Sequence, residues 1–210
     1  MKRLPFAVVA ACVLGLVFYA LYPSGVDTSV SRHVSTSAPA TQDLGQPVSL
    51  GASSQPTSQS LRGYTYAGLP KGAEYKLLMN KGYIVGYSER HKDPVWAAYR
   101  LFRTDSPYQF RRPSRFAIDE RTAARVSHND YTNSGYDRGH MAPNSAIMSR
   151  YGREAQIETF LMSNVCPQQP NLNRGMWEEL ESREANDYAD RFGQVWVIDG
   201  PIFDANPRRL

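Results

Sequence analysis

The chain has 210 residues, with 24 Lys and Arg against 20 Asp and Glu, 41% apolar residues, 11% aromatic residues and 2 cysteines. This composition excludes a collagen, a coiled coil and a wholly disordered chain. The charge is unevenly placed, because residues 1–60 hold three Lys or Arg and two Asp or Glu, while residues 61–210 hold 21 and 18. We therefore expect the chemically active part of the chain within residues 61–210, which are numerous enough for one hydrophobic core.

The cysteines and histidines argue against two common kinds of small site. Cys12 lies in an apolar run and Cys166 stands alone in the charged region, so no disulfide framework is indicated. One cysteine and four scattered histidines do not match the spacing of a usual zinc site. Cys166 has no neighbours that would activate a thiolate, and we expect it to be a packed residue.

The N-terminal segment is strongly apolar. After Lys2 and Arg3, no charged residue occurs from Leu4 to Val26, which is long enough for a helix that crosses a membrane. We predict that residues 1–22 form a signal anchor or transmembrane helix, with a cleaved signal peptide and a lipoprotein processing site at Cys12 as alternatives. The positive charges precede this span, so the rest of the chain is expected outside the cytoplasm. We expect a membrane-anchored periplasmic protein, with secretion or the mitochondrial intermembrane space as alternatives.

Residues 23–60 have the composition of a tether. Of these 38 residues, 25 are Ser, Thr, Pro, Gly or Gln, and none is aromatic. Such a segment cannot bury enough apolar surface to fold, and we predict a disordered linker that ends where the domain of residues 61–210 begins.

The remaining sequence predicts an α+β domain. Residues 82–87 and 95–102 are rich in aromatic and aliphatic side chains and are predicted strands. Helical spacing of apolar residues predicts helices over 152–162 and 172–192, and the apolar run 194–199 predicts a central strand. Strands, a loop, two helices and a further strand in this order are typical of an α+β fold.

Seven arginines interleaved with aromatic residues occur between positions 100 and 125, from the end of the second predicted strand onward. They are Arg100, Arg103, Arg111, Arg112, Arg115, Arg121 and Arg125. Arginine forks fit phosphate oxygens and aromatic faces stack on bases, so the segment has the chemistry of a nucleic-acid groove. An ordinary solvated basic surface has the same composition, and this segment alone does not decide between the two.

The run Tyr136–Pro143 holds the first set of candidate catalytic residues. His140 can take a proton from water near physiological pH, and Arg138 can bind a phosphate. A lone histidine is more often a packed or surface residue than a catalyst. His128, followed by Asn129 and Asp130, could suggest a His-Asn-His type of metal motif. Its neighbours are loop-like, and we do not expect it to be a catalytic residue.

A second polar cluster follows at Asn164 and at residues 171–181. Mg²⁺ prefers oxygen ligands and keeps several waters, so one carboxamide with a carboxylate nearby is an adequate protein contribution. On one ideal α-helix, Asn173 and Glu181 would lie roughly 12 Å apart along the axis and about 80° apart around it. We therefore do not expect both residues to bind one ion directly. Glu181 would act through a water that is bound to the metal.

Four ordered motifs together resemble the DNA/RNA non-specific endonuclease family, the ββα-metal or His-Me finger nucleases. They are the Asp-Arg-Gly-His run 137–140, the run 161–168, Leu172-Asn173 with Trp177, and the spacing to Glu181. The resemblance spans residues 64–204. It implies an α+β domain with a mainly antiparallel sheet flanked by helices, and a Mg²⁺-dependent endonuclease, in which Mn²⁺ can substitute, that cleaves DNA and RNA without sequence preference.

Carried over by position, the resemblance implies a role for each candidate. His140 would be the general base, and Asn173 would hold the Mg²⁺. Arg138 matches the arginine of the family's Asp-Arg-Gly-His motif, and Arg115 matches its upstream phosphate-binding arginine. Glu181 matches the family's carboxylate that acts on the metal through a bound water. Asn164 matches the asparagine beside the general base.

The resemblance also leaves open points about the whole molecule. Family members continue past the position of Leu210 with further strands, so we expect an incomplete sheet whose free edge favours pairing with another chain, a homodimer included. A fragment, a truncated product and a protein completed by a partner are the three alternatives. Two alternatives to an endonuclease remain: a catalytically inactive nucleic-acid-binding module and a phosphodiesterase for small nucleotides.

Overall fold

A computed structural model describes residues 61, 63–66, 68–72 and 74–203 of the chain. The predicted anchor at 1–22 and the linker at 23–60 lie outside these residues. Within the described part of the chain, no helix is both long enough and apolar enough to cross a membrane.

A four-stranded antiparallel sheet forms the base of the domain. Its order is β1 (Lys76–Asn80), β2 (Tyr83–Ser88), β3 (Asp93–Phe102) and β6 (Gln194–Asp199), and each neighbouring pair is antiparallel. The predictions of strands at 82–87, 95–102 and 194–199 are confirmed. The prediction of a central strand at 194–199 is wrong, because β6 is the last strand in this order.

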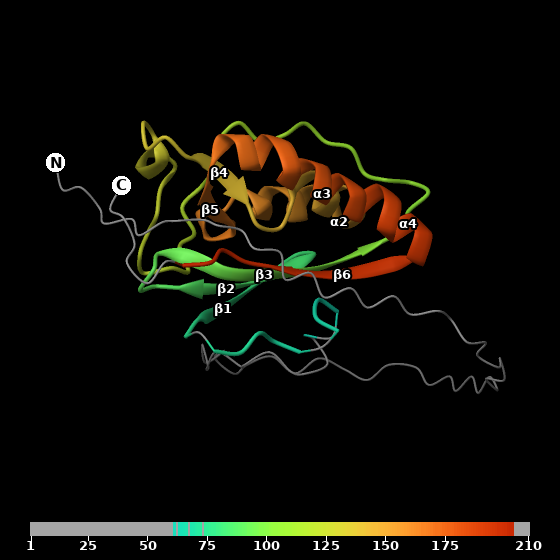
Figure 1. The fold of residues 1–210 in the computed structure, drawn as a ribbon, viewed down its shortest axis with the longest axis horizontal. Coiled ribbons are helices and arrows are strands. Elements are labelled where there is room, and N and C mark those ends of the chain that lie inside the picture. The colour runs from blue at the N-terminus through green and yellow to red at the C-terminus, as the bar shows by residue number, and fades with distance from the viewer. Residues whose placement is uncertain (1–60, 62, 67, 73, 204–210) are drawn as a thin grey trace, which may run out of the picture.

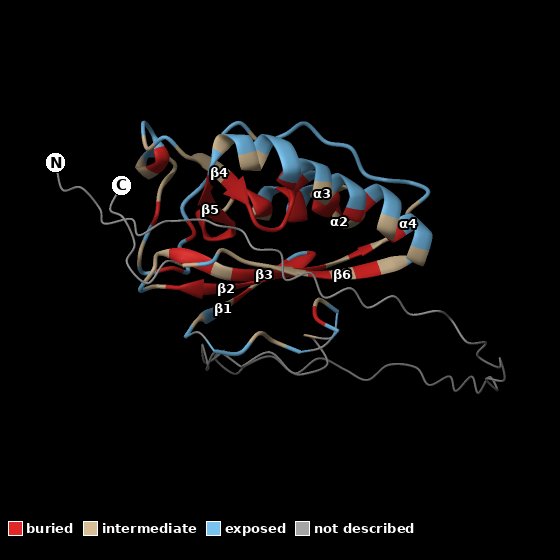
Figure 2. Cartoon of the chain, in the orientation of Figure 1, coloured by how far each residue is buried: buried red, intermediate tan, exposed pale blue. Residues whose placement is uncertain are grey.

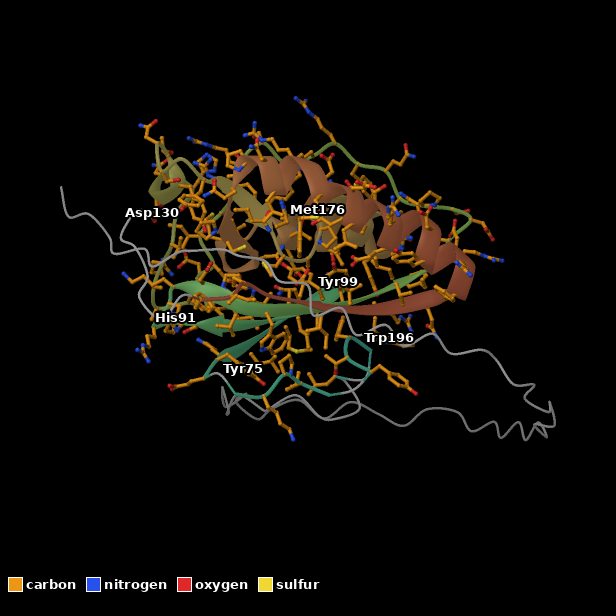
Figure 3. All side chains as sticks on the ribbon, in the orientation of Figure 1. Tyr75, His91, Tyr99, Asp130, Met176 and Trp196 are labelled. Atoms are coloured by element: carbon orange, nitrogen blue, oxygen red, sulfur yellow. The ribbon has the colours of Figure 1, made fainter. Side chains whose placement is uncertain are left out.

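Both faces of the sheet are covered, which explains why β6 has the apolar sequence of a central strand. Tyr83, Tyr99 and Val197 belong to the core between sheet and helices, whereas Ile84 and Trp96 pack with residues of the segment 61–75 on the other face. Figure 1 shows the helices above the sheet and this segment beneath it. Figure 2 shows buried residues on the strands and on the inner faces of the helices, and Figure 3 shows Tyr99 and Trp196 on opposite sides of the sheet. Every residue of β2 is buried as a result.

The helical layer differs from ideal α-helices at two places. Helix α2 (Asn144–Thr159) begins eight residues before the predicted start, since Gly152, with φ 87° and ψ −169°, interrupts it and hides its first half from a periodicity argument. The predicted helix 172–192 is confirmed, but it contains two wider π-helical stretches. It consists of η3 (Leu172–Trp177), α3 (Glu178–Arg183), η4 (Glu184–Tyr188) and α4 (Ala189–Phe192).

Two short strands that the sequence analysis did not predict carry the motifs of greatest interest. β4 (Asp137–His140) pairs antiparallel with β5 (Val165–Gln168), so that His140 lies opposite Val165 and Gly139 opposite Cys166. A Cβ on Gly139 would meet side-chain atoms of Gln168 at 2.2–2.4 Å, so this close approach requires glycine. The short helices η1 (His128–Tyr131) and η2 (Met162–Asn164) precede the two strands.

Candidate active site

A cavity of about 550 Å³ lies between α2, the 172–192 helix and the segment 107–112. His140, Asn173 and Glu181 all line it, although they come from different parts of the sequence. Of the six predicted site residues, the structure thus brings these three together. Arg138, Arg115 and Asn164 do not line the cavity.

His140 is the last residue of β4 and is buried, with 8% of its surface exposed. Its ring lies 5.1 Å from that of Phe116 and 5.0 Å from that of Phe160, and its Nε2 is buried with no hydrogen-bond partner among the described residues. Burial, followed by the positive charge of Arg112, lowers the pKa of His140 to about 3. The imidazole is therefore neutral at physiological pH, which is the protonation state that a general base needs, and nearby negative charge such as that of a phosphate would strengthen it as a base.

Asn164 is fully buried and holds the chain that leaves β4. Its Oδ1 accepts from the N–H of Ala142 at 2.9 Å, and its Nδ2 donates to the carbonyl oxygens of Ala142 and Thr159, each at 3.0 Å. Its own carbonyl accepts from the N–H of Met141 at 2.9 Å. Asn164 therefore fixes the backbone directly after His140 and is a positioning residue.

Asn173 is oriented by the first residue of β4. Its Nδ2 donates to Asp137 Oδ2 at 3.0 Å, and the same carboxylate forms an ion pair with Arg174 at 2.6 Å. These contacts lower the pKa of Asp137, with the hydrogen bonds from Arg174 as the largest cause. Because the side-chain amide nitrogen of Asn173 donates to Asp137, its side-chain carbonyl oxygen remains available to accept a hydrogen bond or bind a cation in the cavity.

Glu181 is the second oxygen donor of the cavity. Its Oε1 is buried without a hydrogen-bond partner among the described residues. Burial, and then the nearby Glu184, raises its pKa to about 8. A cation near this carboxylate would favour the ionised form and lower that pKa.

The chain between Asn173 and Glu181 departs from an ideal α-helix. Asn173 lies in η3, a π-helical stretch in which Gly175 has the non-helical backbone angles φ −124° and ψ −108°. The offset of about 80° that an ideal α-helix would give therefore does not apply between the two residues. Both side chains line one cavity.

The donor set fits a hard divalent cation held by few protein ligands. The described residues contain no cluster of three or more His, Cys, Asp or Glu that could hold a metal. The carbonyl oxygen of Asn173 and the Oε1 of Glu181, which has no hydrogen-bond partner among the described residues, are oxygen donors of the kind that Mg²⁺ accepts together with several waters.

The two predicted phosphate-binding arginines lie away from the cavity. Arg138 donates from Nε and Nη2 to the carbonyl oxygen of His128, at 3.0 and 2.7 Å, and from Nη2 to Thr132 at 3.1 Å. These hydrogen bonds hold the guanidinium of Arg138 against the loop before β4. Arg115 is exposed on the segment before η1.

The sequence analysis did not single out Arg112 and Asn144, which do line the cavity. Arg112 is exposed, and its guanidinium lies 5.1 Å from the centre of the Phe160 ring. Its position in the run of seven arginines was the available signal, but the family resemblance pointed to Arg115 instead. Asn144 begins α2, and its Oδ1 is buried without a partner among the described residues.

The two residues set aside in the sequence analysis lie outside the cavity. The ring of His128 stacks on Phe116 at 6.1 Å, and its carbonyl oxygen holds Arg138. Cys166 is buried in the core, with its Sγ 3.2 Å from the Sδ of Met141. This contact agrees with a packed residue.

Comparison with known proteins gives a consistent family. A family model described as DNA/RNA non-specific endonuclease matches residues 63–209. The mitochondrial nuclease EXOG of Danio rerio is 35% identical over 139 residues, which are 64% of this chain and 39% of that protein. Human mitochondrial endonuclease G is 34% identical over 142 residues, which are 65% of this chain and 45% of that protein. The chain therefore spans less than half the length of these relatives.

A solved structure shares the architecture. The crystal structure of an EndoG/EndoGI complex, which addresses the mechanism of EndoG inhibition, matches with a TM-score of 0.58 and 25% sequence identity. The match covers 75% of this chain and 66% of that chain. The α+β arrangement of helices on an antiparallel sheet is thus shared with that protein.

Replacing Asn164 with alanine should destabilise the domain. The change removes three side-chain hydrogen bonds to buried backbone groups, and we expect the free energy of unfolding to fall by about 3 kcal/mol or more. Urea denaturation measures this loss. N129A, at an exposed asparagine, is the control and should stay within about 0.5 kcal/mol of the parent chain. Equal stability of the two variants would contradict the positioning role.

The depressed pKa of His140 predicts a pH dependence of stability. The unfolded chain binds a proton near the ordinary pKa of 6.5 and the folded chain only near 3, so stability is lost as pH falls below about 6.5. H140Q lacks this titration. Between pH 7 and pH 5 in EDTA, we expect the parent chain to lose about 1–2 kcal/mol more unfolding free energy than H140Q. Parallel urea-denaturation profiles would show that His140 is not buried as described.

Proposed function

This chain belongs to the DNA/RNA non-specific endonuclease family, and we propose that it is a metal-dependent endonuclease that hydrolyses phosphodiester bonds of DNA and RNA. The observation that carries this proposal is the convergence of His140, Asn173 and Glu181 on one cavity. β4 and β5 with the helix that follows them would then be the ββα-metal unit of the family. The relatives named as nucleases support the reaction class.

In this proposal His140 is the general base. Its neutral imidazole takes a proton from the attacking water, and the aromatic rings of Phe116 and Phe160 hold it in place. The hydrogen bonds of Asn164 to the backbone of Ala142 would fix the position of the end of β4, and with it His140.

Asn173 would hold a Mg²⁺ ion through its carbonyl oxygen, with Mn²⁺ as a substitute, and Glu181 would bind waters around it. When bound, this cation neutralises the charge that grows on the phosphate and on the leaving oxygen. Asp137 orients the carboxamide of Asn173, and its contact with Arg174 keeps the carboxylate charged and fixed.

The positive charges around the cavity would bind the substrate backbone. Arg112 lines the cavity and Arg115 is exposed on the same segment, so both can contact phosphates. Arg138 acts in this proposal through the loop it holds rather than through the phosphate. Phosphate contacts carry no sequence information, so cleavage should be nearly independent of sequence.

The same proposal places the nuclease at a membrane. We retain residues 1–22 as an anchor, residues 23–60 as a linker and residues 61–210 as the nuclease domain. The positive charge before the apolar run directs the domain to an extracytoplasmic space. Relatives with mitochondrial names support the intermembrane space beside the periplasm.

His140→Ala in the full chain tests the assigned base. We expect Mg²⁺-dependent cleavage of plasmid DNA and of RNA to fall about 10²-fold to 10⁴-fold. Binding of a labelled duplex in EDTA should stay within about threefold, because phosphate contacts supply that affinity. Agarose assays and fluorescence anisotropy measure the two quantities.

His91→Ala is the matched control, since this imidazole stacks on Phe203 away from the cavity, and it should cleave like the parent chain. Unchanged cleavage by H140A would refute the base. A parent chain that binds DNA but releases no product with any divalent metal would instead be a binding module.

A further inference from the structure

Two exposed aromatic side chains lie on the segment 107–112, and the first of them, Tyr108, lines the cavity. Tyr108 and Phe110 have 52% and 42% of their surfaces exposed. Their rings are nearly parallel, with centroids 6.1 Å apart and an interplanar angle of 16°. They lie on the segment that follows β3 and runs along the helical layer (Figure 1). Two nearly parallel rings are therefore accessible to solvent on this segment.

This aromatic surface is held in place by α2 rather than carried on a free loop. The N–H of Tyr108 donates to the carbonyl oxygen of Ser149 at 3.0 Å, and the N–H of Phe110 lies 3.2 Å from the Sδ of Met148. The ring of Tyr108 passes 3.9 Å from the position of a Cβ on Gly152. Rings that are already oriented lose little conformational entropy when a ligand binds them.

The charges around the surface favour a polyanion with flat groups. Tyr108 lines the same cavity as His140 and Asn173, together with Arg112. Arg111 and Arg112 are exposed and form no ion pair within the part of the chain that the structure describes. Phosphates fit the arginines and a nucleobase fits the rings, because base stacking on aromatic side chains accepts every base.

We propose that Tyr108 and Phe110 form a stacking platform for an unpaired nucleobase next to the scissile phosphate. Inside a duplex both faces of a base are covered by its neighbours, so only a single-stranded or locally opened substrate can use the platform. The chain therefore cleaves single-stranded substrates in preference to duplexes. This inference rests on the proposed nuclease function and adds a substrate preference to it.

The test compares two oligonucleotides with the same number of phosphates. One is a labelled oligo-dT and the other has abasic sites at the same positions, and both are titrated against the full chain in EDTA. Y108A/F110A should lose about tenfold to a hundredfold in affinity for oligo-dT and less than about threefold for the abasic strand. Y108L/F110L keeps apolar contacts but removes the aromatic faces, and it should show the same selective loss.

Two further variants complete the design. Y66A removes an exposed aromatic side chain that packs on Trp196, outside the cavity, and should bind both strands like the parent chain. Y108F/F110Y keeps both rings and should restore the preference for oligo-dT. With Mg²⁺, the platform variants should lose more activity on a single strand than on the same sequence as a duplex.

The outcomes separate this inference from the proposed function. Unchanged affinity of Y108A/F110A, or an equal loss on both strands, overturns the platform. Self-association of the parent chain that disappears in Y108A/F110A, without a change in binding, identifies a protein interface and also overturns it. A parent chain that cleaves nothing but still prefers oligo-dT keeps the platform while the nuclease proposal fails.

Discussion

The antiparallel pairing of β4 with β5 is the contact on which the cavity depends. It sets the end of β4, with His140, against the beginning of β5, and the chain then enters the helix that carries Asn173. Gly139 permits this approach because any side chain there would collide with Gln168. The hydrogen bonds of Asn164 to Ala142 extend the same connection past the end of the strands. Without this pairing, the proposed base and the proposed metal ligand would belong to separate parts of the chain.

Burial shifts the pKa values of His140 and Glu181 in opposite directions. It lowers the pKa of His140 to about 3 and raises that of Glu181 to about 8, and in each case it favours the neutral form. A neutral imidazole has the protonation state that a general base needs, whereas the carboxyl group of Glu181 needs a cation nearby before it becomes a carboxylate. The arginines around the cavity meanwhile provide positive charge for a polyanion. The chemistry of the cavity is thus set by desolvation as much as by the identity of its residues.

Local pattern predicted the long elements and missed the short ones. β2, β3 and the 172–192 helix have enough apolar residues to show their periodicity. β4 and β5 have four residues each and mostly polar or irregular sequence, and they are strands because they pair with each other although helix α2 separates them along the chain. Motif spacing identified His140, Asn173 and Glu181, which line the cavity. It selected Arg115 although Arg112 lines the cavity, because the direction of an exposed arginine depends on tertiary packing.

A double-mutant cycle of His140→Ala and Asn173→Ala, measured as kcat/KM for Mg²⁺-dependent hydrolysis, tests the central claim most directly. Two groups that act on the same phosphodiester contribute as one unit, so the loss in the double variant should be close to that of the more damaged single variant. Losses that multiply, or an Asn173→Ala variant with parental activity, would mean that the two residues do not serve one reaction.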